Sequence, residues 1–229
     1  MTNNCKIEDE ILYKDKGFDE FCKKCFAVGN LYNNHMVLQR QYDFIWCILA
    51  KAFLIKIDRS CKNKFDILLE FCLNDLKCAM HQELYLLALY FKNDPSIGRV
   101  FAKLSKDYNK GIEYALENTT WDLFHSRMTF EHTRFYDTVE NIVILPYFAT
   151  NDKGVYQYLS KCLFKAVIID HGKMIPVYRS SIELSSYIMN ESLQFQLYDE
   201  EHIMKRKVDV TQVNINLIKS KLLQELKTI

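Results

Sequence analysis

The sequence predicts a helix-rich α/β protein with a small parallel sheet in its second half. Three observations predict this fold class: apolar residues recur at helical spacing before residue 135, two short β-branched runs follow, and only 6 Gly and 3 Pro occur among 229 residues. Scarce Gly and Pro favour long helices and disfavour a turn-rich sandwich or barrel. Helices should therefore come first, followed by a strand–helix–strand unit.

The helices are predicted from the period of the apolar residues and from the residues that end each run. The predicted ranges are 33–57, 64–92, 96–107, 112–135 and 210–226. Asn93-Asp94-Pro95 ends the second, because the residue before a proline disfavours the helical conformation. Asn118 or Thr119 is a candidate cap for an internal start within the fourth.

The strand–helix–strand unit is predicted from residues 141–170. Asn141 to Thr150 is typical of a buried strand, Val155 to Leu163 of a helix, and Lys165 to Asp170 of a second strand. Two strands joined through a helix are parallel. We expect a single domain over residues 1–229, with a helical N-terminal extension over about 1–57 and a C-terminal helix over about 210–226.

Composition excludes several classes of protein. A hydrophobic content of 49% with 26% charged residues excludes disorder as the main state, and a net charge of +1 excludes a strongly basic nucleic-acid coat. There is no phosphate-binding loop, dinucleotide fingerprint, zinc-peptidase motif or nucleophile elbow. Without an apolar leader or a membrane-length apolar run, we expect a cytoplasmic protein with no membrane contact, in which the eight cysteines are thiols.

Three acidic residues stand where an acid is unusual. Glu83 lies in an apolar helix, Asp122 lies in a segment rich in apolar residues, and Asp152 follows a predicted buried strand. Ligands of open parallel sheets bind beyond the carboxyl ends of the strands. Carboxylates that converge there repel each other unless a cation joins them, and Mg²⁺ or Mn²⁺ prefers oxygen ligands. Such a cluster can hydrolyse phosphodiesters.

The order of these residues resembles the carboxyl-terminal part of PIN-domain nucleases, over roughly residues 60–170. The closest match is Ala149-Thr-Asn-Asp-Lys-Gly-Val-Tyr-Gln-Tyr-Leu, followed by Phe164-Lys-Ala-Val-Ile-Ile. The resemblance implies an α/β/α fold and a metal-dependent endoribonuclease, common as a toxin or defence component. It also implies that Glu83, Asp122 and Asp152 are catalytic metal ligands, with Asp58 as the candidate for the family's first acid.

Other interpretations of the same residues stay open. Asp152 is also a favourable helix N-cap, Asp122 can complement a helix dipole, and Glu83 can pair with a Lys or Arg. Arg127-Met-Thr-Phe-Glu-His132 resembles the short motif of HEPN-type ribonucleases, all-helical enzymes in which Arg and His act on RNA without a metal. A catalytically inactive PIN-like protein that binds RNA or a partner is a further alternative. The expected partners are RNA, an antitoxin or other partner protein, and a second copy of the chain.

Overall fold

The computed structural model describes residues 35–105, 107–131, 136–137, 142–143, 152–161, 164–170, 173–178 and 184–228. The chain divides into two units, Met1–Gln41 and Tyr42–Ile229, and the second holds most of the described residues. Its helices are α3 (His35–Ile57, which begins in the first unit), α4 (Lys64–Asn74), α5 (His81–Phe91), α6 (Ile112–Glu131), α7 (Lys153–Lys161), α9 (Glu191–Tyr198), α10 (Glu200–Asp209) and α11 (Ile215–Leu226).

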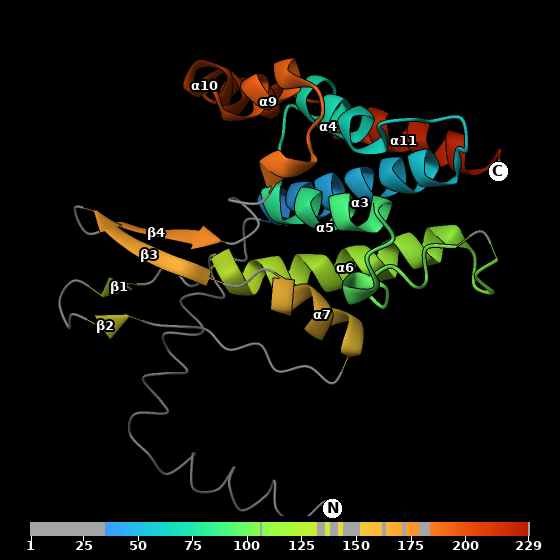
Figure 1. Ribbon diagram of the computed structural model, residues 1–229, viewed down its shortest axis with the longest axis horizontal. Coiled ribbons are helices and arrows are strands. Elements are labelled where there is room, and N and C mark those ends of the chain that lie inside the picture. Colours follow the sequence, from blue (N-terminus) through green and yellow to red (C-terminus); the bar gives the residue numbers. More distant parts are fainter. Residues whose placement is uncertain are drawn as a thin grey trace, which may run out of the picture. The chain divides into compact units, whose positions relative to one another are not determined.

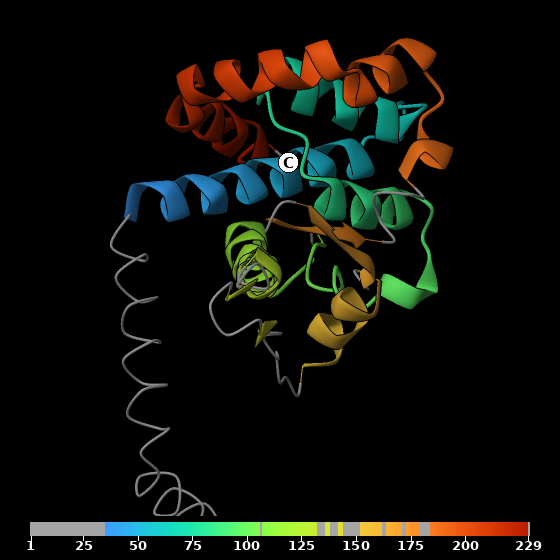
Figure 2. The same ribbon diagram turned by 90° about the vertical axis from the view of Figure 1, so that its left-hand side faces the viewer.

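Helices α3 and α5 form the centre of the second unit. From Tyr42 onward α3 lies between α4, α9, α10 and α11 on one side and α6 and α7 on the other, in both Figure 1 and Figure 2. Every residue from Gln82 to Leu89 of α5 is buried, as expected for a helix surrounded by others. Lys56 donates to the carbonyl of Tyr90 at 2.6 Å and to Asn93 Oδ1 at 2.6 Å, so the end of α3 is attached to the end of α5.

The helix predicted over residues 64–92 is two helices, α4 and α5, so that prediction is wrong in its middle. Lys77, with a φ of 51°, occupies the left-handed region between them. The apolar residues of this connection, Leu76 and Met80, are 0% and 5% exposed. These two buried residues continue the apolar pattern of the helices that flank the connection, so periodicity did not reveal the break.

The predicted parallel sheet is contradicted, and with it the PIN-like α/β/α architecture. Strand β3 (Phe164–Asp170) pairs antiparallel with β4 (Lys173–Tyr178), and β1 (Tyr136–Asp137) pairs antiparallel with β2 (Ile142–Val143). Each described sheet has two strands, and no parallel pair occurs among the described residues. Only two residues separate β3 from β4, whereas a parallel crossover needs a dozen or more. The described part of the chain is therefore mainly helical, with two antiparallel ribbons.

The remaining helix predictions are mixed. Helices α3, α6, α7 and α11 confirm the helices expected at those places, but α6 is continuous through Asn118 and Thr119, so no helix starts there. Residues 96–107 form the 3₁₀ turn η1 (Pro95–Ile97) and further turns instead of a helix. Asp94 caps η1 by accepting the N–H of Ser96 at 2.8 Å. The helix predicted from residue 210 begins at Ile215, after the 3₁₀ turn η4 (Val210–Gln212). Helices α9 and α10 and the 3₁₀ turn η3 (Leu184–Tyr187) were not predicted.

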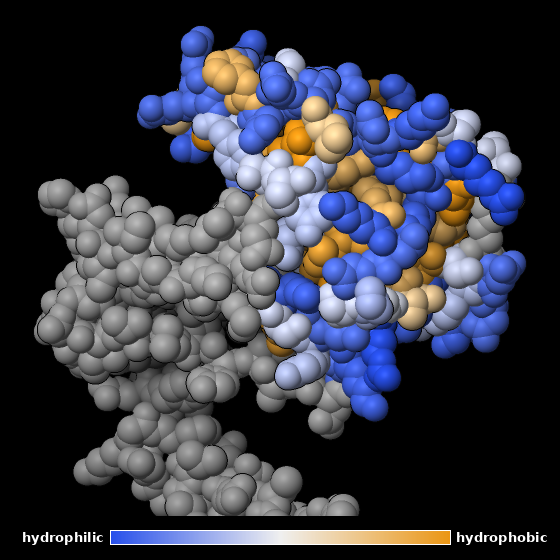
Figure 3. Space-filling model, in the orientation of Figure 1, coloured by the Kyte–Doolittle hydropathy of each residue, from blue (hydrophilic) through white to orange (hydrophobic). Residues whose placement is uncertain are grey.

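The surface of the described part is polar, with scattered apolar side chains. On the face in Figure 3, hydrophobic residues lie among hydrophilic ones. Large apolar side chains that are more than half exposed include Tyr156, Phe195 and Met189. Across the described helices, none combines the length and the apolar character that a bilayer crossing requires. Cys47, Cys61, Cys72 and Cys78 are not part of disulfide bonds.

Candidate functional site

A small cavity of about 40 Å³ lies where α6, α7 and the turns after η1 meet. Helix α6 contributes Thr119, Asp122, Leu123 and Ser126, whose spacing of three and four residues places them on one face. The other lining residues are Arg99, Val100, Lys103, Asp152, Gly154, Val155 and Tyr158. Two of the predicted ligands, Asp122 and Asp152, are thus brought together from positions 30 residues apart.

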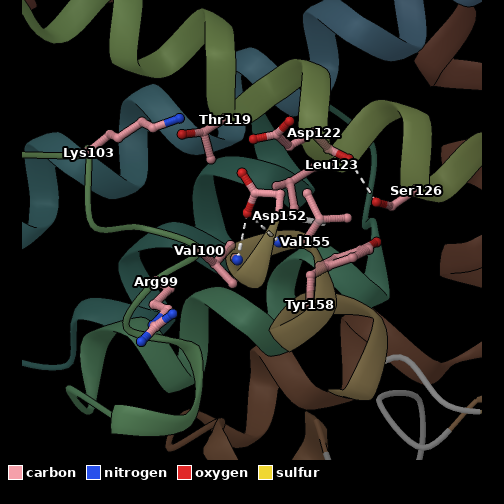
Figure 4. Close-up of a pocket in the computed structure, with 11 residues that line it drawn as sticks. Arg99, Val100, Lys103, Thr119, Asp122, Leu123, Ser126, Asp152, Val155 and Tyr158 are labelled. Atoms are coloured by element: carbon pink, nitrogen blue, oxygen red, sulfur yellow. Dashed lines mark hydrogen bonds between the residues drawn. The ribbon is translucent and has the colours of Figure 1, made fainter. Parts of the chain in front are cut away.

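The two carboxyl groups face each other across this cavity. Figure 4 shows the side chains of Asp122 and Asp152 pointing toward one another, with the Lys103 ammonium on the Thr119 side and the Arg99 guanidinium directed away. The pKa of Asp122 is raised, first by partial burial and then by the negative charge of Asp152, while Lys103 and His125 oppose the rise. This is the electrostatic state of two like charges that share a confined space.

Asp152 is also the N-cap of α7. Its Oδ1 accepts the N–H of Gly154 at 2.6 Å and that of Val155 at 3.1 Å, which satisfies two of the unpaired donors at the helix start. A Cβ on Gly154 would lie 3.0 Å from the carbonyl oxygen of Arg99 and from Asp152 Oδ1, so glycine allows the close approach. Capping fixes the orientation of the carboxylate and positions it in the cavity.

Tyr158 and Gln157 fix the position of α7. The Tyr158 hydroxyl is 3.3 Å from Gln82 Oε1 of α5, and the Arg99 N–H donates to Gln157 Oε1 at 3.0 Å. Tyr158 is 1% exposed. The wall that carries Asp152 is therefore attached both to the central helix and to the turns that carry Lys103.

Glu83 does not join the other two acids. It is 1% exposed, and both of its carboxylate oxygens accept from Arg127 Nη1, at 3.1 and 2.8 Å. It does not line the cavity, and its carboxylate is used in an ion pair between α5 and α6. The structure therefore has the ion-pair arrangement that the sequence left open, in place of the predicted ligand role.

Asp58 is also separate from the cavity. Its Oδ1 accepts the N–H of Ser60 at 2.8 Å and the hydroxyl of Ser60 at 2.7 Å, and Cys61 Sγ lies 3.1 Å from its Oδ2. These hydrogen bonds lower the pKa of Asp58 to about 2. Asp58 thus closes an exposed turn after α3. Within the described part of the chain, no three His, Cys, Asp or Glu side chains form a cluster that could hold a metal ion.

Only one residue of the Arg127–His132 alternative is described by the structure. Arg127 is 21% exposed and is held by Glu83, and His132 lies outside the described residues.

Five polar residues of the cavity were missed by the sequence analysis: Arg99, Lys103, Thr119, Ser126 and Tyr158. Thr119 and Ser126 lie three residues before and four residues after Asp122 on α6, so the helical period did contain the signal for both. Lys103 could not be found this way, because its segment was predicted to be helical and is a series of turns.

Comparison with known proteins does not extend this description. No family model, curated protein or solved structure matches the chain. The chemistry of the site rests on its own residues.

These residues fit a divalent cation in one coordination mode. Mg²⁺ is commonly bound through one or two carboxylates and keeps several of its waters, which Asp122 and Asp152 can provide. A cavity of about 40 Å³ has room for an ion with on the order of two waters, since about 10–15 Å³ of this measure holds one. Lys103 opposes cation binding, because its positive charge already offsets the two carboxylates in part.

Proposed function

We propose that this protein is a divalent-cation-dependent ribonuclease in which Asp122 and Asp152 hold Mg²⁺ or Mn²⁺. The observation that supports it is the pair of facing carboxylates in a small cavity, where burial and then the charge of Asp152 raise the pKa of Asp122. Repulsion between the two negative charges destabilises such a pair, and a bound cation relieves this repulsion. The proposal does not include Glu83 or Asp58 as ligands.

Each residue of the cavity has a defined part in this proposal. Asp152, held by two N–H groups of α7, provides a fixed carboxylate, and Asp122 provides a second one whose proton affinity is raised. Lys103 lies beside them and can pair with a phosphate oxygen of the substrate. A bound divalent cation would supply Lewis acidity and lower the pKa of a coordinated water. The cavity is too small for a nucleotide, so the phosphodiester would approach from its rim.

A cation-binding measurement on the purified full chain tests the first step. Wild-type protein should bind Mn²⁺ saturably in an electron paramagnetic resonance titration, and Asp122→Asn should weaken this binding at least tenfold. Asp107→Asn is a matched control, because Asp107 is an exposed acid of the preceding turns that does not line the cavity. Equal Mn²⁺ affinity in all three proteins would refute the proposed site.

An RNA-cleavage assay tests the activity. Cleavage of a mixed-sequence RNA should require Mg²⁺ or Mn²⁺, stop with EDTA, and be lost in Asp122→Asn and Asp152→Asn. Mn²⁺ binding without any cleavage would instead support the non-catalytic alternative, a protein that binds RNA or a partner.

A metal-independent ribonuclease that uses Arg127 and His132 is the second candidate. The helix-rich body favours it, since that chemistry needs no sheet, and Glu83 holds the Arg127 guanidinium in a fixed position. Arginine can stabilise phosphate charge while histidine transfers the proton.

Inhibition by EDTA separates the two candidates. Cleavage that continues in EDTA, survives Asp122→Asn and is lost in His132→Asn would replace the first proposal with the second. The His132 variant is preferred to one at Arg127, because removing Arg127 would leave Glu83 buried without its cation.

A further inference from the structure

A second cavity carries positive charge from two parts of the chain. It has a volume of about 250 Å³ and is lined by Lys77, Cys78, Ala79, His81, Leu197, Ile203, Arg206, Lys207 and Val210. It shares no residue with the Asp122–Asp152 cavity. No acidic residue lines it in the part of the chain that the structure describes. Three cationic side chains in one cavity are notable in a protein whose net charge is only +1.

Arg206 is the central charge of this cavity. Its guanidinium donates to the carbonyl of Leu197 at 2.9 Å and to that of Gln196, at the end of α9. Partial burial lowers its pKa, and among the described residues no carboxylate forms an ion pair with it. A guanidinium has five N–H donors, so these two carbonyls leave donors for a ligand. A desolvated cation without a carboxylate is stabilised by an anion.

The opposite wall comes from the start of α5. His81 is the first residue of this helix, and Met80 at its N-cap provides no side-chain acceptor for the first N–H groups. Burial is the main cause that lowers the pKa of His81, and the positive charges of Arg206 and Arg127 add to it. The positive end of the α5 dipole adds to the charge of Lys77, Arg206 and Lys207.

We propose that this cavity binds a phosphate group between Arg206, Lys77 and Lys207. A tetrahedral dianion accepts from several donors at once, and the three cations come from the α4–α5 connection and from α10. The volume accommodates a phosphate with several waters. Leu197, Ile203 and Val210 provide apolar walls, where a charge–charge interaction is screened less than in water. The phosphate comes either free or as the monoester of a nucleotide, and both present the same group.

Calorimetric titration of the full chain with inorganic phosphate tests this proposal. The variant Lys77→Asn, Lys207→Gln should weaken the Kd about tenfold or more, since each charge-assisted hydrogen bond is worth roughly an order of magnitude. Asn is chosen at position 77 because it tolerates the left-handed backbone found there. Lys205→Gln is the matched control, since Lys205 is an exposed lysine on α10 that does not line the cavity; it should stay within about twofold.

Adenosine 5′-monophosphate in a parallel titration distinguishes the source. Tighter binding of the nucleotide than of phosphate assigns the cavity to a phosphate monoester, and equal binding assigns it to free phosphate. The ring resonances of His81 should shift on binding in either case, because His81 lines the cavity. The proposal is overturned if neither probe binds saturably, or if the double variant binds phosphate as wild type does. It is also overturned if the His81 resonances do not move at saturation.

Discussion

Glu83 and Asp122 are two acidic residues of adjacent helices that meet opposite conditions. Glu83 is 1% exposed and has a guanidinium as its partner, whereas Asp122 is half-buried and faces a second carboxylate. The first arrangement is neutral and structural, and the second accumulates negative charge. An acidic residue in an apolar helix therefore indicates that a partner lies nearby. Only the fold determines whether this partner is a cation that neutralises the carboxylate or a second acid that adds to the negative charge.

The largest difference should appear when the cation partner of Glu83 is removed. Arg127→Met leaves a buried carboxylate without its cation, and should lower the free energy of unfolding by about 3–5 kcal/mol. Urea denaturation measures it. Adding Glu83→Gln to this variant should recover part of the loss, because the buried charge is then gone. A loss below about 1 kcal/mol would show that the pair behaves like an exposed one.

The helices were the part of the fold that the sequence could predict, and the reason is periodicity. Helices α6 and α11 place apolar residues on a face that the core covers, and α3 is buried on all sides over residues 43–50. The same signal failed at Leu76 and Met80, because two buried residues of a loop can match the apolar spacing of the flanking helices. Alternating or continuous apolar runs indicate a strand but not the direction of its partner, so β3 was assigned to a parallel sheet.

The candidate site could be predicted only in part. Asp122 and Asp152 were selected because a charged side chain in an apolar segment needs a partner or a ligand. The structure brings both residues to one cavity. Glu83 satisfied the same criterion, and its partner, 44 positions later, was considered only for another motif. The sequence indicates which side chains need partners, whereas the identity of each partner depends on how α5, α6 and α7 pack.

A smaller effect should separate the two roles of Asp152. Asp152→Ala removes the acceptor for the N–H groups of Gly154 and Val155, and should cost about 1 kcal/mol, less whatever the relieved repulsion with Asp122 returns. Asp152→Asn keeps a capping oxygen and removes only the charge, so it should be more stable than the alanine variant. Chemical denaturation of both at neutral pH measures the difference. Equal stabilities would mean that the cap contributes nothing.

The smallest expected effect is a change in the pH dependence of stability, caused by Asp122. Its pKa is raised in the folded state, so from the unfolded value of about 3.9 up to the folded value the native protein binds more protons than the unfolded chain. Stability must then fall as pH rises through this interval, and the loss persists above it. Asp122→Asn removes that contribution, so wild type should lose stability relative to the variant as the pH rises above about 4. Asp58 and Asp94, whose pKa values are lowered, act in the opposite direction but equally in both proteins, and cancel in the difference. Parallel stability curves would mean that the Asp122 carboxyl is not under strain from Asp152, and a divalent cation at this pair would then have no repulsion to relieve.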